Sequence, residues 1–123
     1  MPRILVIDDQ ADVRAMIAMV LRIHHFEVVE AAGSASGLKA FEEATFDLAI
    51  VDIFLSGSNG YEVIVAMRER APRLPIVAIS GMTALGFVAG NPELANVVGL
   101  QKPFRPNQLM AAIQKALTAS PVA

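Results

Sequence analysis

Residues 49–53 read Ala-Ile-Val-Asp-Ile, a short apolar run that a single aspartate interrupts. A run of this length, rich in β-branched residues, is typical of a buried parallel strand. Asp52 stands where such a strand would leave the core, and a carboxylate there is costly unless a metal, a cation or a proton compensates its charge. The stretch therefore predicts both a central strand and a polar site at the end of that strand.

Three further apolar runs of the chain also end in polar residues. In an open α/β sheet, ligands bind beyond the carboxyl ends of the parallel strands. We therefore predict that the polar residues at the four strand ends come together in one site. These residues are Asp8 and Asp9, Asp52, Ser80, and Lys102.

Apolar strands alternate with helical patterns along the whole chain, which predicts βαβ units and an α/β fold with a five-stranded parallel sheet and five helices. The expected strands are Ile4–Ile7, Phe26–Val29, Asp47–Val51, Pro75–Ile79 and one within Ala95–Leu100. The last helix is expected to face the core with Leu109, Ile113, Ala116 and Leu117, which follow helical spacing. Residues 56–60 are expected to form a loop on composition. We expect one domain over residues 1–119 and a short tail over 120–123.

Composition narrows the classes of function. The hydrophobic fraction is 54% but the aromatic fraction only 6%, so the core must be aliphatic. The net charge of -2 gives no electrostatic reason to expect nucleic acid or a membrane surface as a partner. The chain has no cysteine, which excludes a thiolate metal site or a thiol nucleophile. No apolar run reaches the roughly 18 residues of a membrane span, so we expect a soluble, cytoplasmic protein.

The predicted site has the composition of a magnesium-dependent phosphoryl site. Three crowded carboxylates, Asp8, Asp9 and Asp52, raise one another's pKa or require a cation, and hard oxygen ligands without His or Cys suit Mg²⁺. Ser80 adds a hydroxyl, and Lys102 adds a mobile charge suited to a phosphoryl oxygen. A carboxylate can itself be the nucleophile that forms an aspartyl phosphate.

With these residues in this order, the chain resembles the receiver domain of two-component response regulators over nearly its whole length. The matching residues are Asp8-Asp9, Asp52, Gly60, Ser80 and Lys102-Pro103-Phe104. The resemblance implies a strand order of 2-1-3-4-5 and a cis peptide between Lys102 and Pro103. It also implies a function in signalling rather than as a separate enzyme, apart from the domain's own phosphorylation and dephosphorylation.

The resemblance further implies a role for each site residue. Asp52 would be the phosphoacceptor, and Ser80 and Lys102 would hold phosphoryl oxygens. Mg²⁺ would be bound directly by Asp9, Asp52 and the main-chain carbonyl of Phe54, while Asp8 would act mainly through metal-bound water. The phosphoryl donor would be a phosphohistidine on a sensor histidine kinase or phosphotransfer protein, or a small acyl phosphate. Output would pass to an unidentified downstream protein.

The chain departs from the family's pattern at four places. Gly99 stands three residues before Lys102, where the family usually has a Tyr or Phe whose ring moves. Ser56 stands four residues after Asp52, where the family commonly has a proline. Phe54 and Met82 are apolar and stand at positions that, in the family, line the approach to the phosphoryl group. Because apolar residues there would hinder the attacking water, we hypothesise slow dephosphorylation. The segment Met82–Asn96 is apolar where the family is usually charged, and we hypothesise a partner or homodimer surface there.

Two other functions compete with the phosphorylatable receiver, which the sequence predicts to have no output domain of its own. A pseudo-receiver would keep the fold and switch without phosphate. Gly99 and Ser56 favour this alternative, whereas the intact set of site residues argues against it. A magnesium-dependent phosphatase of the haloacid dehalogenase type would need an Asp-x-Asp pattern on the first strand, which Asp8-Asp9-Gln10 does not supply. We interpret the pair His24-His25 as structural, at the end of a helix.

Overall fold

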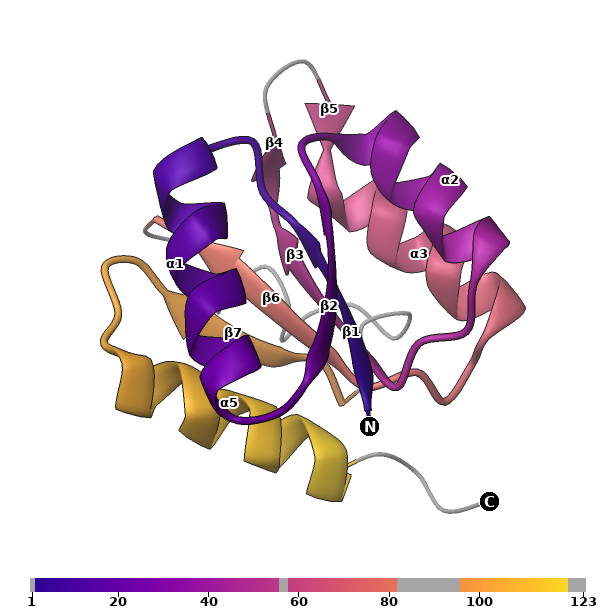
Figure 1. Cartoon of the computed structure of the whole chain (residues 1–123). Coiled ribbons are helices and arrows are strands. Elements are labelled where there is room, and N and C mark those ends of the chain that lie inside the picture. The colour runs from indigo at the N-terminus through magenta and orange to yellow at the C-terminus, as the bar shows by residue number, and fades with distance from the viewer. Residues whose placement is uncertain (1, 56–57, 82–95, 120–123) are drawn as a thin grey trace.

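Five strands form one parallel sheet in the order β2-β1-β3-β6-β7 (Figure 1). The computed structural model of the chain describes residues 2–55, 58–81 and 96–119. The strands of the sheet are β1 (Arg3–Ile7), β2 (Glu27–Ala31), β3 (Leu48–Asp52), β6 (Ile76–Ser80) and β7 (Val98–Gln101). The helices are α1 (Ala11–Ile23), α2 (Ser34–Glu43), α3 (Gly60–Arg70) and α5 (Pro106–Ala119). The predicted α/β fold and strand order are confirmed.

The helices cover both faces of the sheet. α1 and α5 pack on one face, and α2 and α3 pack on the other (Figure 1). All five residues of β3 and of β6 are buried, as expected for central strands that have helices on both sides. The core is aliphatic, with Leu5 and Ile64 in the cluster under α2 and α3, and Ile50 in the cluster under α1 and α5.

The predicted cis peptide between Lys102 and Pro103 is present. Of the five predicted helices, four lie in the described part of the chain. The hypothesised surface at Met82–Asn96 falls, except for Asn96, outside the described residues, and so does the predicted tail over 120–123. Among the described residues, no helix combines the length and the apolar composition that crossing a membrane requires.

Two local predictions were wrong. Leu117 does not face the core, because 37% of it is exposed, and Ala112 is buried instead. The inner stripe of α5 is therefore Leu109, Ala112, Ile113 and Ala116. The predicted loop also contains regular structure, since β4 (Phe54–Leu55) pairs with β5 (Ser58–Asn59) in an antiparallel hairpin. Two-residue strands have no periodicity that a sequence pattern could reveal.

The end of α1 supports the structural interpretation of the two histidines. His24 follows the last residue of the helix, and its Nδ1 lies 2.9 Å from the carbonyl oxygen of Val20. His25 has a φ of 66°, in the left-handed region where a chain commonly turns away from a helix. Both residues therefore serve to end α1.

Candidate functional site

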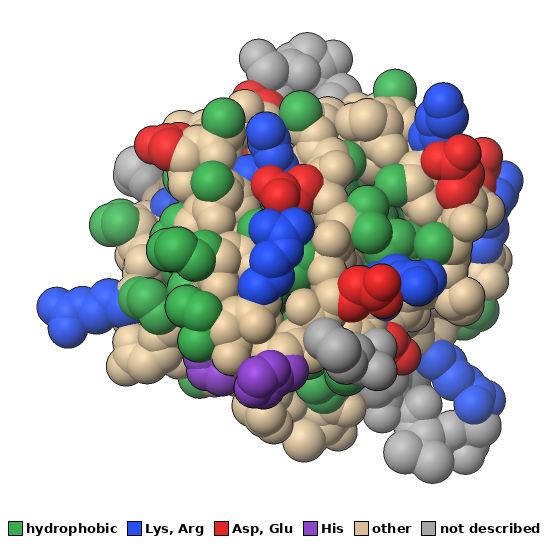
Figure 2. All heavy atoms as spheres, viewed as in Figure 1, with side chains coloured by type: hydrophobic (Ala, Val, Ile, Leu, Met, Phe, Trp, Pro, Cys, Tyr) green, Lys and Arg blue, Asp and Glu red, His purple; other side chains and the backbone are tan. Residues whose placement is uncertain are grey.

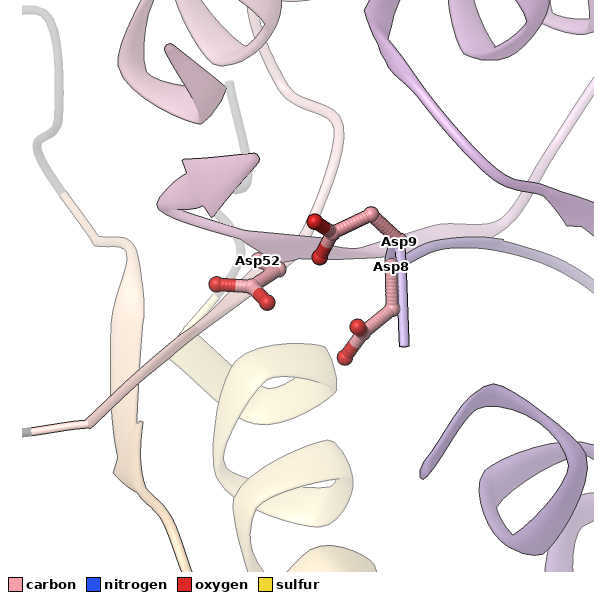
Figure 3. A group of neighbouring side chains, drawn as sticks. All are labelled: Asp8, Asp9 and Asp52. Atoms are coloured by element: carbon pink, nitrogen blue, oxygen red, sulfur yellow. The ribbon is translucent and has the colours of Figure 1, made fainter. Parts of the chain in front are cut away.

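Three aspartates meet at the carboxyl end of the sheet. Asp8 and Asp9 follow β1, and Asp52 is the last residue of β3; the first two carboxylates extend to the side on which Asp52 lies (Figure 3). One carboxylate oxygen from each of them lies within 4.8 Å of the others. Asp8 and Asp52 are buried, while Asp9 is half-buried. The predicted acidic cluster is thus present, on two adjacent strands.

Lys102 lies between two of these carboxylates. Its Nζ is 2.9 Å from Oδ2 of Asp52 and 3.2 Å from Oδ2 of Asp8, and only 17% of its side chain is exposed. Burial alone would lower the pKa of Lys102, but hydrogen bonding to Asp52 and the charges of Asp52 and Asp8 outweigh it and raise the pKa. The lysine is therefore held as an ammonium ion at the site.

Strand geometry explains why these three side chains meet. Side chains alternate between the two faces of a strand, and Ile50 and Leu100 pack in the cluster under α1 and α5. Two residues farther along, Asp52 and Lys102 emerge toward that same face. Asp8 continues the same alternation beyond β1, where Val6 belongs to this cluster.

Asp8 is a fully buried carboxylate whose pKa is raised above the usual value. Burial is the largest effect and raises the pKa of Asp8; the charge of Asp52 raises it further, although hydrogen bonding by Gln10 and the charge of Lys102 act in the opposite direction. Its Oδ1 accepts a hydrogen bond from the main-chain N–H of Gln10 at 2.9 Å. Its Oδ2 is buried near Lys102, yet in the part of the chain that the structure describes no donor is aligned to hydrogen-bond it.

The donor set fits a hard divalent cation. It consists of carboxylate oxygens, one of which lacks an aligned donor among the described residues. Mg²⁺ takes one or two carboxylates and keeps several waters, which such a cluster can accommodate. Asp8, Asp9 and Asp52 are the residues that could hold it.

The main chain around Asp52 is fixed from both sides. The N–H of Ile53 donates to the carbonyl of Ile79 at 2.8 Å, and the N–H of Gly60 donates to the carbonyl of Ile53 at 2.9 Å. A Cβ at position 60 would overlap the carbonyl oxygen of Asp52 and lie 2.8 Å from Cα of Ile53. Only glycine permits this close approach, which explains physically why Gly60 belongs to the motif.

The hairpin that follows Asp52 orients the Phe54 carbonyl. Neighbouring pairs in an antiparallel ladder alternate between hydrogen-bonded and non-hydrogen-bonded. Because Gly60 hydrogen-bonds to Ile53, the next pair, Phe54 with Asn59, falls in the non-hydrogen-bonded class. The Phe54 carbonyl is thereby directed away from the partner strand.

The sequence of the chain identifies its family. Residues 4–114 match the profile of the response regulator receiver domain. The chain belongs to this family. It is 32% identical over 120 residues to the DNA-binding response regulator MtrA of Mycolicibacterium paratuberculosis, an alignment that covers 94% of this chain and 51% of MtrA. The chain spans between 24% and 51% of the length of such curated relatives.

Solved receiver structures have the same fold. The chemotaxis protein CheY4 of Vibrio cholerae superposes with a TM-score of 0.88 at 27% identity, over 95% of this chain and 99% of that one. The response regulator TrrA of Thermotoga maritima, solved in complex with Mg²⁺ and BeF, superposes with a TM-score of 0.81 at 26% identity, over 95% of this chain and all of that one.

Ser80 is the last residue of β6, the strand next to β3 in this receiver domain. It is buried, and it follows Ile79, which pairs with Asp52 in the sheet. Its carbonyl accepts a hydrogen bond from the main-chain N–H of Lys102 at 2.7 Å. Ser80 therefore fixes the main chain of the lysine, whereas the role of its hydroxyl stays a prediction.

Two polar residues of α1 and its start were missed by sequence reasoning. Oε1 of Gln10 lies 2.6 Å from Nζ of Lys102. Nη1 of Arg14 donates to the main-chain carbonyl of Asp8 at 2.7 Å. Gln10 follows the aspartate pair directly, which is the one signal that could have identified it; the contact of Arg14 depends on how α1 packs.

Arg14 is itself held by an ion network between α1 and β2. Its Nε lies 3.5 Å from Oε1 of Glu30, and Arg22 lies 3.4 Å from the other oxygen of that carboxylate. In Figure 2, basic and acidic side chains alternate on the face of the receiver domain that carries these elements. The network ties β2 to α1 next to the loop that carries Asp8.

Proposed function

We propose that this chain is a phosphorylatable receiver domain that accepts a phosphoryl group on Asp52 from a sensor histidine kinase or phosphotransfer protein. The observation that carries the proposal is the setting of Asp52. This buried carboxylate has an ammonium group 2.9 Å away and two further carboxylates grouped around it. Such a group of charges suits a reaction whose main requirement is the neutralisation of phosphoryl oxygens.

The transfer is a substitution at phosphorus. An oxygen of the Asp52 carboxylate forms a bond to phosphorus, while the bond from phosphorus to the donor's histidine nitrogen, or to the acetate oxygen of acetyl phosphate, breaks. The electron pair of the broken bond leaves with the donor. Lys102 binds one phosphoryl oxygen through its ammonium group, and the Ser80 hydroxyl donates to another.

Mg²⁺ is the cofactor that we assign to this site, with Asp9, Asp52 and the Phe54 carbonyl as direct ligands and Asp8 acting through bound water. When bound, Mg²⁺ supplies positive charge to the transferring phosphoryl group. The burial of Asp8 Oδ2 beside this cluster supports the assignment, and so does the Mg²⁺ and BeF complex of the similar TrrA.

The domain would signal through protein–protein contacts or phosphorelay to an unidentified downstream protein in the cytoplasm. We do not assign it a separate enzymatic activity. The hypothesised homodimer or partner surface at Met82–Asn96 and the slow dephosphorylation attributed to Phe54 and Met82 stay proposals that the described residues do not address.

The decisive test is intact-mass measurement after incubation with acetyl phosphate and Mg²⁺. The wild-type protein is expected to gain one phosphoryl group, and the Asp52→Asn variant none. Asp12→Asn is the matched control, because Asp12 is an exposed aspartate in the first turn of α1; it should be phosphorylated like wild type. An adduct that persists on Asp52→Asn, or that forms equally well with EDTA, would contradict the proposal.

A pseudo-receiver is the second candidate, and Gly99 is the observation that favours it. Gly99 lies in β7 opposite Ala78 of β6 and has no side chain that could move when the site changes state. If the wild-type protein forms no adduct, and if beryllofluoride with Mg²⁺ leaves its melting temperature unchanged, this second function replaces the first.

A further inference from the structure

The ammonium group of Lys102 has a close contact with Gln10 in addition to its two aspartate partners. An ammonium has three N–H bonds and no acceptor. Nζ of Lys102 donates to Oδ2 of Asp52 at 2.9 Å and to Oε1 of Gln10 at 2.6 Å, and its ion-pair partner Oδ2 of Asp8 lies at 3.2 Å without an aligned hydrogen bond. The contact with Gln10 is the shortest of the three, although the amide carries no charge.

The side chain of Gln10 is not required by the helix that it precedes. Gln10 occupies the N-cap position of α1, but its side chain makes no capping hydrogen bond. The bond to Asp8 comes from its main-chain N–H, and its carbonyl accepts from the N–H of Arg14. These main-chain bonds survive a change of side chain, so the amide contact with Lys102 can be removed by itself.

We propose that Gln10 is a positioning residue for Lys102, and that it holds the ammonium group where a phosphoryl oxygen on Asp52 will be bound. This inference rests on the proposed function of Asp52. The hydrogen bond to Gln10 and the attraction of Asp8 hold the ammonium group beside Asp52, so that the lysine is oriented before the phosphoryl group arrives.

The movement of negative charge during phosphoryl transfer explains why Lys102 needs the oxygen of Gln10 as a partner besides the aspartates. When Asp52 becomes an acyl phosphate, its carboxylate charge is lost and the negative charge lies on the phosphoryl oxygens. The donor that served Asp52 then passes to a phosphoryl oxygen, while the hydrogen bond to Gln10 and the ion pair with Asp8 remain. A hydrogen bond that involves a charged group is stronger than a neutral one, so losing the amide oxygen should weaken this orientation measurably.

The test compares Gln10→Ala with wild type in two measurements. The first is the NMR signal of the Lys102 ammonium group, whose protons exchange slowly with water only while they are hydrogen-bonded. The second is the affinity for beryllofluoride in the presence of Mg²⁺. We expect the signal to broaden or disappear and the affinity to fall by about fivefold, a size typical of one lost hydrogen bond to a charged group in a partly exposed site.

Two further variants separate positioning from a general structural effect. Gln10→Glu keeps an acceptor oxygen at the same reach and should retain the ammonium signal. Gln114→Ala changes an exposed glutamine of α5 and should match wild type in both measurements. The thermal stability of metal-free Gln10→Ala should fall only by the contribution of this one hydrogen bond, because the main-chain bonds of Gln10 remain.

The outcomes distinguish this inference from the proposed function. An unchanged ammonium signal in Gln10→Ala overturns the inference, even if the beryllofluoride affinity falls. If the wild-type protein never binds beryllofluoride, the proposed function fails; a signal lost in Gln10→Ala would then still support Gln10 as the residue that positions Lys102.

Discussion

Nζ of Lys102 and Oδ2 of Asp52 lie 2.9 Å apart, although 50 residues separate them in the sequence. The pair joins the end of β3 to the residue that follows β7, and β6 lies between those strands. Both groups are largely buried, with 17% of the lysine side chain and 5% of the aspartate side chain exposed. The site therefore contains a largely buried ion pair that joins two strands that are not neighbours in the sheet.

Replacing Lys102 with Met should destabilise the metal-free protein. Breaking a buried ion pair leaves a charge without compensation and typically costs about 3 kcal/mol, and here Asp8 and Asp52 would both lose their cation. Urea denaturation in EDTA measures the change. Lys115→Met in α5 is the control, because Lys115 is exposed and should alter the free energy of unfolding by less than about 0.5 kcal/mol. Equal effects of the two substitutions would argue against a structural ion pair.

Mg²⁺ should stabilise the fold, and Asp9 should be required for this effect. A ligand at about 100 times its dissociation constant raises the free energy of unfolding by about 2.7 kcal/mol. Asp9→Asn should raise the metal-free melting temperature, because it removes one of the three crowded charges, and it should abolish the shift caused by Mg²⁺. Differential scanning calorimetry with and without Mg²⁺ measures both effects. A normal Mg²⁺ shift in Asp9→Asn would remove Asp9 from the metal site.

The stability of the metal-free protein should depend on the ionisation of Asp8. Its pKa is raised in the fold above the usual 3.8, mainly by burial, so between these two pKa values the folded state binds more protons than the unfolded state. The contribution of Asp8 to stability therefore falls as the pH rises from about 4 through the raised pKa. Asp8→Asn should remove this part of the pH dependence and increase the free energy of unfolding at neutral pH.

The check for Asp8 is a series of urea titrations in EDTA between pH 4 and pH 8. Asp12→Asn is again the matched control, since Asp12 is exposed and should leave the slope of stability against pH unchanged. The interpretation is wrong if Asp8→Asn proves less stable than wild type across the whole range.

Substituting Gly60 by Ala should destabilise the fold and disturb Asp52. The new Cβ would overlap the carbonyl of Asp52, which is backbone and cannot move aside as a flexible side chain would. We expect a loss of about 2 kcal/mol, in the range of overpacked sites, and slower phosphorylation by acetyl phosphate. Gly33→Ala is the control, because nothing lies within 4 Å of its added Cβ; it should cost less than about 1 kcal/mol, from the preference for glycine at an N-cap. Thermal unfolding and intact mass provide both readouts.

Much of the fold could be predicted because its signals are local. The apolar runs that became β3 and β6 are buried on both faces, and such strands are recognisable without knowledge of their neighbours. The order of the strands could not be predicted from local signals, because the alternation of strands and helices does not specify which strands are adjacent. It was predicted from the resemblance to receiver domains. The hairpin of β4 and β5 was missed because its strands are too short to show a period.

The inner face of α5 shows where a correct pattern is still insufficient. Ala112 and Leu117 are both apolar and both close to the predicted stripe, yet Ala112 is buried and Leu117 is 37% exposed. The choice depends on how the helix is rotated against β6 and β7, which places Ala112 in the core cluster. Hydrophobicity alone favours the larger residue, so the sequence pattern selected the wrong one.

The sequence by itself determined which residues end the strands, and hence that Asp8, Asp9, Asp52 and Lys102 would face one edge of the sheet. Only the tertiary structure decided which atoms meet there: the ammonium between two carboxylates, the amide of Gln10 as its third partner, and Gly60 against the carbonyl of Asp52. The physical reason is that strand and helix periodicities arise from neighbours in the chain, whereas these contacts join segments far apart in sequence whose distances are set by the packing of the sheet.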